Sequence, residues 1–457
     1  MSRGSRRVAV VGAGLAGLLA ARELRRRGVS VTVYESGRQV AGLARSFTDQ
    51  EGFTYDFGAH FITNRLAAAL GIGGECRDVG YYGESVFLEG RAYSYPFGLL
   101  RSPRFLLGAL KARLPPRSDQ SLPRTAADWY RRQYGGALAD QVAIPLVEAW
   151  SGAAATELAA SVIPPQVERG TAHVLGLKLA SRVSGRAVAN GYSREKPESP
   201  HVWHVYPVGS LGRVCERLAE GLDRSIRLES PVEAILTDGN RVCGVRLHGS
   251  DEEADAVVST APVHILAKLV RGSDAVKHLA RFRYRPMALV NMRFRGRSVL
   301  PDVVTWIPER RFPFFRLTEA ARSMPWLAPE GKTIVTVDLG CEVGDGIWRM
   351  PDEELGEHCL GHLVSLFPAL RNRYLGCAVL RTPVAHPVFL NAYEADRLAL
   401  EASSPILGLY SIGRNGEFAH ILMEDVYWRT LAKMRHVLAY LDARPAHEQH
   451  LHPEALV

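Results

Sequence analysis

Three glycines and a carboxylate near the start of the chain have the spacing of a nucleotide-binding site. Residues 12–17 read GAGLAG, which places Gly12, Gly14 and Gly17 in a G-x-G-x-x-G pattern, and Glu35 ends the apolar run that follows. The first glycine permits a tight turn, the second lets the backbone approach a pyrophosphate, and the third lets a helix and a strand pack closely. A carboxylate at the end of the next strand accepts both hydroxyls of an unphosphorylated ribose. The pattern predicts FAD or NAD, held by Gly12, Gly14, Ala16, Gly17, Glu35 and Ser36.

Positioning these residues requires a strand, a helix and a second strand. Residues 7–12 (RVAVVG) form a short β-branched run that ends in glycine, which is typical of a buried parallel strand. Residues 15–27 carry leucines at helical spacing, and Gly28 ends that pattern. Residues 29–35 (VSVTVYE) then alternate as a second strand. Together they predict a βαβ unit at the N-terminus.

The rest of the chain predicts a second domain inserted into the first. After residue 66 the pattern changes to helical segments such as 126–150, and strand patterning returns at 225–260. Further expected elements are strands at 288–294 and 333–339, an amphipathic helix at 352–367, a strand and glycine turn at 406–414, and a long helix at 418–441. The expected fold class is α/β. A discontinuous Rossmann-like FAD-binding domain would comprise residues 1–65, 201–272 and 396–445. An inserted substrate domain of mixed sheet and helices would comprise 66–200 and 273–395, with a tail at 446–457.

Two segments after the first βαβ unit resemble a known flavoprotein superfamily. Residues 41–46 (AGLARS) and 52–60 (GFTYDFGAH) are similar to segments shared by amine oxidases, protoporphyrinogen oxidases and UDP-galactopyranose mutases. The resemblance implies FAD as the cofactor, with Arg45 offsetting the pyrophosphate charge. Ala41 replaces a glycine of the family pattern, which matters little if its φ is negative. The cofactor contacts that these two segments imply are Gly42, Leu43, Ala44, Arg45, Gly58, Ala59 and His60.

The resemblance continues in family order along the chain. Residues 206–211 (YPVGSL) and 259–262 (STAP) are similar to family segments that precede and follow a re-entry into the FAD domain. Val232 matches a position whose backbone meets the adenine. Residues 408–418 are similar to the closing motif, which implies cofactor contacts from Gly413 and Arg414. The next helix, around Leu422 and Met423, would point its N-terminus at the flavin C2 carbonyl, where its dipole favours negative charge.

The expected substrate region carries two arginines and several histidines. Residues 315–319 (FRLTE) resemble a mutase segment whose arginine, here Arg316, binds a nucleotide-sugar diphosphate, and Arg414 matches a second such arginine. An ion pair between Arg316 and Glu319 is the simpler alternative. His60 would serve either as a proton shuttle or as a hydrogen-bonded residue beside the flavin. The candidate catalytic residues are therefore His60, Arg316 and Arg414.

These residues favour one function over two alternatives. Phe418, His420 and His386 stand where mutases carry tyrosines, which weakens the resemblance to that branch. We expect a FAD-dependent oxidoreductase that oxidises an amine, an amino sugar or a related biosynthetic intermediate by hydride transfer to flavin N5. The first alternative is a non-redox sugar-nucleotide mutase that uses reduced FAD. The second is a flavin-free binding protein of the Rab GDP-dissociation-inhibitor type.

Composition narrows the partners and the compartment. The formal net charge is +8, but 49 of the 56 basic residues are arginines and they are dispersed, so we expect no nucleic-acid partner. The expected partner is a small molecule, with anionic compounds and nucleotide sugars among the candidates, and the oligomeric state is left open. No uninterrupted apolar run reaches the ~18 residues of a membrane span. Six cysteines without a CxxC pair predict reduced thiols and a cytoplasmic location. His358 and His362 lie one helical turn apart without a third ligand nearby, so we expect no metal site.

Overall fold

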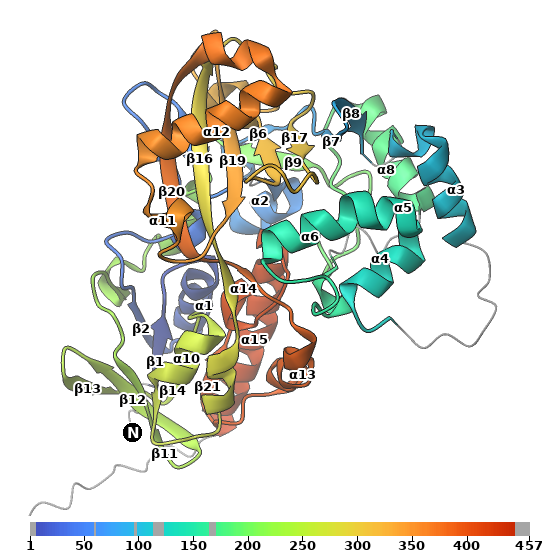
Figure 1. Cartoon of the computed structure of the whole chain (residues 1–457). Helices are drawn as coiled ribbons and strands as arrows, with labels where there is room; N and C mark the ends of the chain where they lie inside the picture. The colour runs from blue at the N-terminus through green and yellow to red at the C-terminus, as the bar shows by residue number, and fades with distance from the viewer. Residues whose placement is uncertain (1–5, 59–60, 96–97, 113–122, 164–170, 444–457) are drawn as a thin grey trace, which may run out of the picture.

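A five-stranded parallel sheet forms the base of the molecule (Figure 1). The computed structural model describes residues 6–58, 61–95, 98–112, 123–163 and 171–443. The strand order is β10 (Ile226–Arg227), β2 (Ser30–Tyr34), β1 (Arg7–Val11), β14 (Ala256–Ser259) and β21 (Leu409–Ser411). All four pairings are parallel. Strands far apart in sequence thus form one sheet, and the predicted fold class is confirmed.

Both faces of this sheet are buried because alternate residues of β1 enter different cores. Val8 and Val10 pack with α1 (Leu15–Arg26) and α15 (Met423–Ala443). Ala9 and Val11 pack with α10 (Val263–Leu269) and with a second sheet. That four-stranded sheet has the order β13 (Ser250–Glu253), β12 (Arg241–Leu247), β11 (Ala234–Asp238) and β15 (Val270–Arg271). Apolar residues at every position of a strand are what such double coverage requires.

A seven-stranded sheet forms the upper half of the molecule in Figure 1. Its order is β20 (Tyr374–Pro387), β16 (Tyr284–Arg295), β19 (Lys332–Gly340), β18 (Arg316–Thr318), β17 (Val304–Trp306), β7 (Glu84–Leu88) and β8 (Arg91–Ser94). Ala288 and Val290 of β16 face α12 (Asp352–Leu366). Met287 and Leu289 face the other way, in a cluster that includes Phe57 and Trp150. The second face of this sheet is therefore directed at the predicted cofactor segments.

The helices that join these sheets differ from expectation at three places. The helix predicted from residue 418 begins at Met423, because Phe418 has a φ of 48° and a left-handed residue cannot continue a right-handed helix. The region 126–150 is divided after Gly135, whose φ is 78°. Its parts are α4 (Ala126–Tyr134), α5 (Gly136–Leu138), a π-helical turn (Ala139–Ala143) and α6 (Ile144–Ser151). The first core also extends beyond residue 65, through α2 (Asn64–Leu70) to Val79. The domain boundaries themselves stay a prediction.

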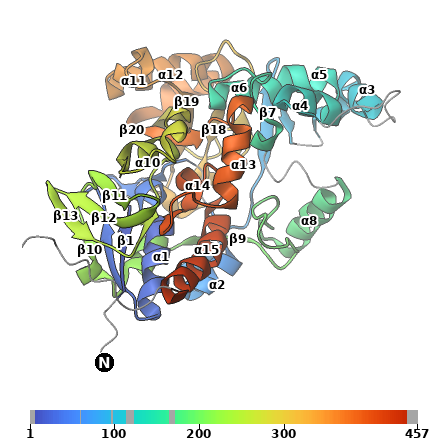
Figure 2. The same cartoon turned by 90° about the horizontal axis from the view of Figure 1, so that it is seen from below.

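The remaining elements are short and lie around the two sheets. Figure 2 shows α3, α4, α5 and α6 gathered at the end of the molecule away from the four-stranded sheet. The strands not yet named are β3 (Ser46–Thr48), β4 (Thr54–Asp56), β5 (Ile62–Thr63), β6 (Cys76–Asp78) and β9 (His204–Pro207). The helices not yet named are α3 (Pro103–Ala112), α8 (Thr171–Ser184), α9 (Arg213–Ala219), α11 (Gly346–Arg349), α13 (Glu394–Ala402) and α14 (Gly413–Gly416).

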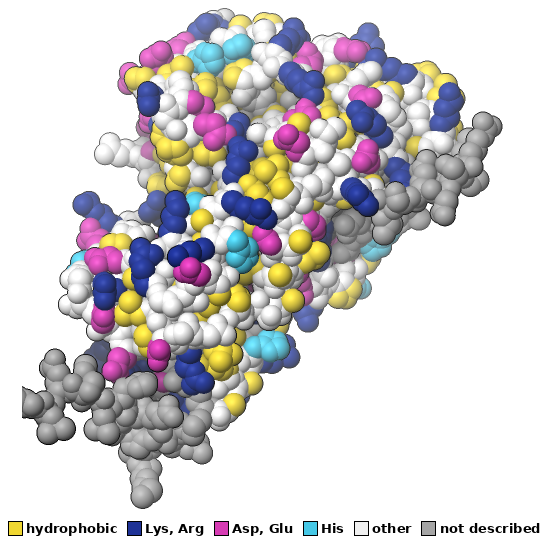
Figure 3. Space-filling view, turned by 60° about the horizontal axis from the view of Figure 1, so that its bottom comes forward, with side chains coloured by type: hydrophobic (Ala, Val, Ile, Leu, Met, Phe, Trp, Pro, Cys, Tyr) yellow, Lys and Arg dark blue, Asp and Glu magenta, His cyan; other side chains and the backbone are white. Residues whose placement is uncertain are grey.

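The surface and the helices bear on the partners expected from composition. On the face seen in Figure 3, Lys and Arg side chains are dispersed among Asp and Glu side chains rather than gathered in a stripe. Among the described helices, none combines the length and the apolar character that crossing a bilayer requires. The described residues include all six cysteines, and each has a free thiol.

Candidate functional site

The glycine loop between β1 and α1 has room for a ligand at one glycine only. Gly12 has a φ of 97°, and a Cβ there would lie 2.1 Å from Oγ1 of Thr260. A Cβ on Gly17 would lie 1.9 Å from the carbonyl oxygen of Gly12. A Cβ on Gly14 would meet no heavy atom within 4 Å. Gly12 and Gly17 therefore serve the packing of helix on strand, and Gly14 borders the open space in which a pyrophosphate fits.

The N-terminus of α1 borders this open space. Its N-cap residue is Gly14, and no side chain caps the first turn. Uncapped N–H groups at a helix start form an anion site with the helix dipole. Gly413 reaches the same turn from the other end of the chain, since a Cβ on Gly413 would lie 2.9 Å from Cβ of Ala16. The structure thus brings the opening and closing cofactor motifs together.

Glu35 lies at the carboxyl end of β2, where its carboxylate orients the glycine loop. Oε2 accepts a hydrogen bond from the backbone N–H of Ala13 at 2.8 Å, and Oε1 accepts one from Gly37 N–H at 2.8 Å. The Ser36 hydroxyl lies 3.4 Å from Oε1. Each carboxylate oxygen keeps a further lone pair for a ribose hydroxyl. The backbone N–H of Ser230 donates to the carbonyl of Glu35. Val232, two residues further on, is half-buried and therefore lies near the predicted binding site for the adenosine of FAD.

The second cofactor segment packs directly on the first, and the condition under which its alanine would matter little is not met. Ala41 N–H donates to the carbonyl of Ala13 at 2.9 Å, which places Ala41 next to Gly14. The φ of Ala41 is +89°, not negative, because that pairing turns the chain sharply into the 3-10 helix of Gly42–Ala44. An alanine in this region is strained, which explains why a glycine suits this position. Leu43 and Ala44 complete the same short helix.

Arg45 follows this turn with an unsatisfied donor. Its Nε atom is enclosed by protein and has no hydrogen-bond partner among the described residues. Its guanidinium lies 4.9 Å from the centre of the Phe47 ring. A cation with an unused donor beside the glycine loop suits two phosphate charges. Together with the open space at Gly14 and the uncapped helix, these features fit the ADP part of FAD.

A buried acid connects the third cofactor segment to the YPVGSL segment. Asp56 accepts hydrogen bonds from the hydroxyls of Ser46 and Tyr206, the latter at 3.0 Å. The Tyr206 oxygen in turn accepts the Leu211 N–H at 3.2 Å. Burial raises the pKa of Asp56 to about 6, with these hydrogen bonds acting in the opposite direction. Gly58 follows and bonds back to the Asp56 carbonyl at 2.9 Å. Ala59 and His60 lie outside the described residues, so the roles expected of them stay predictions.

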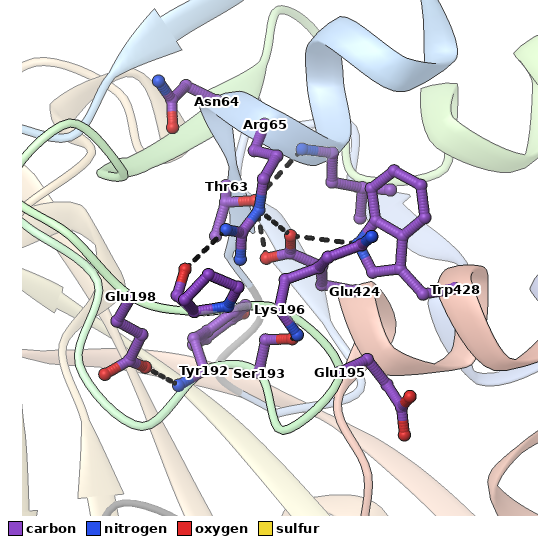
Figure 4. A network of polar contacts seen from close by, with 12 residues as sticks. Thr63, Asn64, Arg65, Tyr192, Ser193, Glu195, Lys196, Glu198, Glu424 and Trp428 are labelled. Carbon is purple, nitrogen blue, oxygen red and sulfur yellow. Dashed lines mark hydrogen bonds and ion pairs between the residues drawn. The ribbon is translucent and has the colours of Figure 1, made fainter.

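The start of α15, where Leu422 and Met423 lie, is held by two buried acids. Glu424 accepts a hydrogen bond from the Thr63 hydroxyl at 2.8 Å and pairs with Arg65 (Figure 4). Asp425 accepts bonds from the Ser193 hydroxyl and from the backbone N–H of Arg194. These contacts fix the N-terminus of α15 against β5 and the loop of residues 191–198. The helix end predicted to face the flavin is therefore anchored on two sides.

Arg414 is the least compensated cation of the candidate substrate region. Its Nη2 lies 2.6 Å from Nδ1 of His386, and its Nε is enclosed without a hydrogen-bond partner. Among the described residues no carboxylate forms an ion pair with it. Burial, followed by the charge of Arg316, lowers the pKa of Arg414 to about 10. The Arg414 guanidinium is still charged at neutral pH. A largely enclosed positive charge is unfavourable unless an anion pairs with it, so Arg414 is suited to bind one.

Arg316 is held in place by an acid that the sequence did not single out. Its Nε donates to Oδ2 of Asp338 at 2.7 Å, and the two residues are partners in the β18–β19 register. Asp338 is fully buried, and burial raises its pKa although Arg316 opposes that rise. The alternative of an ion pair with Glu319 is wrong. Glu319 follows the last residue of β18 and accepts bonds from Leu300 N–H and the Thr333 hydroxyl instead. Its odd spacing of three residues from Arg316 directs the two side chains to opposite sides of the extended chain.

Aromatic rings pack around the candidate substrate region near Arg414. The Trp150 ring lies 5.1 Å from that of His386 and 5.6 Å from that of His420. Burial and the nearby Arg414 and Arg194 lower the pKa of His420 to about 3, so its ring is neutral at physiological pH. The sequence did not place Trp150 next to these two histidines, because their contact depends on the fold. Asp338 carried no signal in the sequence apart from strand alternation.

Comparisons with known proteins agree with this geometry. A family model described as flavin containing amine oxidoreductase matches residues 89–415, and a model described as NAD(P)-binding Rossmann-like domain matches residues 10–69. A crystal structure of reduced UDP-galactopyranose mutase superposes with a TM-score of 0.78 at 18% identity, covering 95% of this chain and 96% of that one. A putative protoporphyrinogen oxidase from Exiguobacterium sp. 255-15 gives a TM-score of 0.73 at 19% identity, covering 96% and 100%. At these identities the likeness concerns the fold.

Curated relatives match over a part of their own length, from 8% to 38%. A flavin-containing monooxygenase, FMO GS-OX-like 6 of Arabidopsis thaliana, is 67% identical over 39 residues, which is 8% of this chain and 8% of that protein. The chain thus matches only a small part of the length of such relatives. The family-model match over residues 89–415 is the broader finding, and it confirms the predicted flavin cofactor and the oxidoreductase class.

Proposed function

The chain belongs to the flavin-containing amine oxidoreductase family, and on that basis we propose that it oxidises a small molecule that carries an anionic group. The oxidised part is an amine, an amino sugar or a related carbon centre. The observation that carries the proposal is Arg414, which is largely enclosed, has no carboxylate partner among the described residues and lies near a second cation. Two neighbouring guanidinium groups repel a bare ammonium substrate and attract phosphate or carboxylate.

The residues of this region would divide the work between binding and orientation. When bound, FAD supplies the acceptor for a hydride from a substrate C–H, with reoxidation by O2 or another acceptor. Arg414 binds the substrate anion, and His386 fixes the direction of its guanidinium. Asp338 fixes the position of the Arg316 guanidinium by accepting a hydrogen bond from its Nε. The neutral His420 and Trp150 exclude water around the anion, which strengthens its attraction to the arginines.

A second candidate function rests on the closeness of Arg316 and Arg414. Burial, and after it the charge of Arg316, lowers the pKa of Arg414, so the two guanidinium groups lie close enough to interact. Two neighbouring arginines suit a diphosphate, which is the group a nucleotide sugar offers. A non-redox mutase would use the same clamp and consume no electrons overall. The replacement of tyrosines by His386, Phe418 and His420 favours oxidation over this alternative.

The two functions differ in what happens to flavin colour and product mass. Anaerobic oxidised holoenzyme is mixed with candidate amines, amino sugars and nucleotide sugars while the flavin absorbance is followed. We expect a true substrate to bleach the flavin, air to restore it, and the product to weigh two hydrogens less. A product of unchanged mass, formed only after dithionite reduction, would replace oxidation by the mutase reaction. Purified protein that neither carries nor takes up FAD would overturn both.

The role of the arginines has its own test. Arg414→Lys and Arg316→Lys keep the positive charge but lose the planar fork that binds an anion at two atoms. We expect KM to rise about tenfold or more in each variant, with retained FAD absorbance. Arg371→Lys is the matched control, because Arg371 is exposed and pairs with Glu357 on the far side of α12. Equal KM values in all three variants would contradict the anion site.

A further inference from the structure

One face of α8 exposes apolar side chains along its length. Leu175, Leu179 and Val183 are spaced four residues apart, so they lie on one side of the helix. Their exposed fractions are 55%, 62% and 82%. Leu177 on the opposite side is buried, so the helix is oriented with an apolar stripe toward solvent. A soluble protein normally turns such a stripe inward.

Helix α3 repeats this arrangement. Leu106, Leu107 and Leu110 are 41%, 57% and 56% exposed, while Phe105 is buried in a small core with β7. In the described part of the chain, twelve large hydrophobic side chains are exposed, and six of them lie on these two short helices. Both helices lie at the end of the molecule opposite the four-stranded sheet (Figures 1 and 2). The apolar exposure is therefore concentrated at one end.

The two sequence stretches that carry these leucines are rich in basic residues. The sequence stretches 90–118 and 169–194 contain eleven arginines and lysines and no aspartate or glutamate. Arg101, Lys111 and Arg182 are among the exposed ones. Lys178 of α8 donates to the carbonyl of Tyr95 at 2.8 Å, which ties α8 to the chain segment that leads into α3. Acids of neighbouring segments pair with two of the cations, Arg104 with Glu89 and Arg186 with Asp78. Leucines flanked by the exposed cations Arg101, Lys111 and Arg182 complement a surface that is apolar beneath and anionic at its rim.

We propose that α3 and α8 form a docking surface for an anionic lipid bilayer, hereafter the α3/α8 surface. The leucines would enter the boundary between headgroups and acyl chains, and the cations would contact lipid phosphates. A second copy of the chain fits less well, because the same positive surface would have to approach itself. The proposal concerns peripheral attachment of the folded protein and is independent of the reaction that the protein catalyses.

Vesicle binding of the intact, FAD-loaded protein tests the proposal. The probe is a sedimentation assay with vesicles of phosphatidylcholine containing 30% phosphatidylglycerol, compared with pure phosphatidylcholine. We expect wild type to bind the anionic vesicles at least tenfold more tightly, with the difference shrinking as salt is raised. The variant Leu175→Ser/Leu179→Ser/Val183→Ser removes three apolar anchors and should bind about 100-fold more weakly. The variant Lys111→Gln/Arg182→Gln should lose about fivefold per cation on anionic vesicles only.

The matched control removes exposed leucines elsewhere. Leu398→Ser/Leu407→Ser changes side chains that are 52% and 49% exposed on α13 and in the turn before β21. This variant should bind vesicles as wild type does. Flavin absorbance and thermal unfolding establish that each variant is folded. Failure of wild type to bind anionic vesicles overturns the proposal, and so does equal binding by the α8 and control variants. Concentration-dependent dimerisation that the α8 substitutions abolish, without vesicle binding, would assign the surface to a second copy instead.

Discussion

The Nη2 atom of Arg414 lies 2.6 Å from the Nδ1 atom of His386. A guanidinium has only donors, so Nδ1 of His386 must accept, and its ring proton is on Nε2. The histidine therefore acts on Arg414 as a neutral acceptor that fixes its direction. Because Arg414 comes from the closing cofactor motif and His386 from β20, this contact joins the two halves of the molecule at the candidate site.

Replacing His386 should weaken substrate binding more than the chemical step. In His386→Leu the acceptor is lost, and a hydrogen bond to a charged group is worth about 1.5–3 kcal/mol. We expect KM to rise about 10- to 150-fold, with a smaller change in kcat. His386→Asn offers its amide oxygen near the position of Nδ1 and should recover most of the loss. Steady-state kinetics of both variants check this, and identical KM values for Leu and Asn would contradict the orienting role.

Glu35→Ala should weaken FAD binding without changing the substrate region. The substitution removes two acceptors for ribose hydroxyls and the contacts that orient Ala13 and Gly37. At about 1.5–3 kcal/mol for charged hydrogen bonds, the Kd for FAD should rise about 10- to 150-fold. Titration of the apoprotein with FAD measures it. Glu229→Ala is the control, because Glu229 lies near the same loop but pairs with Arg38. Unchanged FAD affinity in folded Glu35→Ala protein would contradict the assignment of Glu35 as the residue that binds the ribose hydroxyls.

Ala41→Gly should stabilise the protein, although it removes a methyl group. Ala41 has a φ of 89°, a region in which an alanine costs about 1–2 kcal/mol and a glycine costs little. Glycine also has a larger backbone entropy in the unfolded chain, which offsets part of this relief. The free energy of unfolding should therefore rise by a net 0.5–1 kcal/mol, roughly. Urea unfolding of the holoprotein measures this difference. Ala67→Gly, in the middle of α2, should instead lower the free energy of unfolding by about 1 kcal/mol. A loss at both positions would contradict the strain at Ala41.

Local pattern was sufficient for the first βαβ unit and for strands such as β16 and β19, but it did not predict the long β20 or the short strands β3 to β9. Glycine spacing, β-branched runs and helical periodicity act over a few residues, so Gly12, Gly14 and Glu35 could be placed from the sequence. Asp338 could not be placed, because its contact with Arg316 depends on the register between two strands. The φ of Ala41 depends on the pairing of Ala41 with the glycine loop, and the start of α15 depends on a left-handed Phe418. In each case the missing information was a contact between distant segments.

The stability of the protein should fall in mild acid, and His204 should account for part of that fall. His204 of β9 lies among the rings of Tyr192, at 4.6 Å, and Phe61, at 5.3 Å. Burial lowers its pKa from 6.5 to about 4. The unfolded chain therefore takes up a proton at this residue before the folded protein does. The stabilisation is fully present above pH 6.5 and is lost as the pH falls toward 4.

His204→Phe keeps an aromatic ring at this position but cannot take up a proton. Between pH 7 and pH 5, wild type should lose about 2 kcal/mol more unfolding free energy than this variant. Urea unfolding followed by circular dichroism at both pH values measures the two differences, and the other titrating groups cancel in the comparison. His201→Phe is the matched control, because His201 is exposed and should follow the wild-type pH dependence. If His204→Phe and wild type lose stability in parallel, the buried neutral histidine is not a source of acid sensitivity. His420, whose pKa is also lowered by its enclosed position, then becomes the residue to vary next.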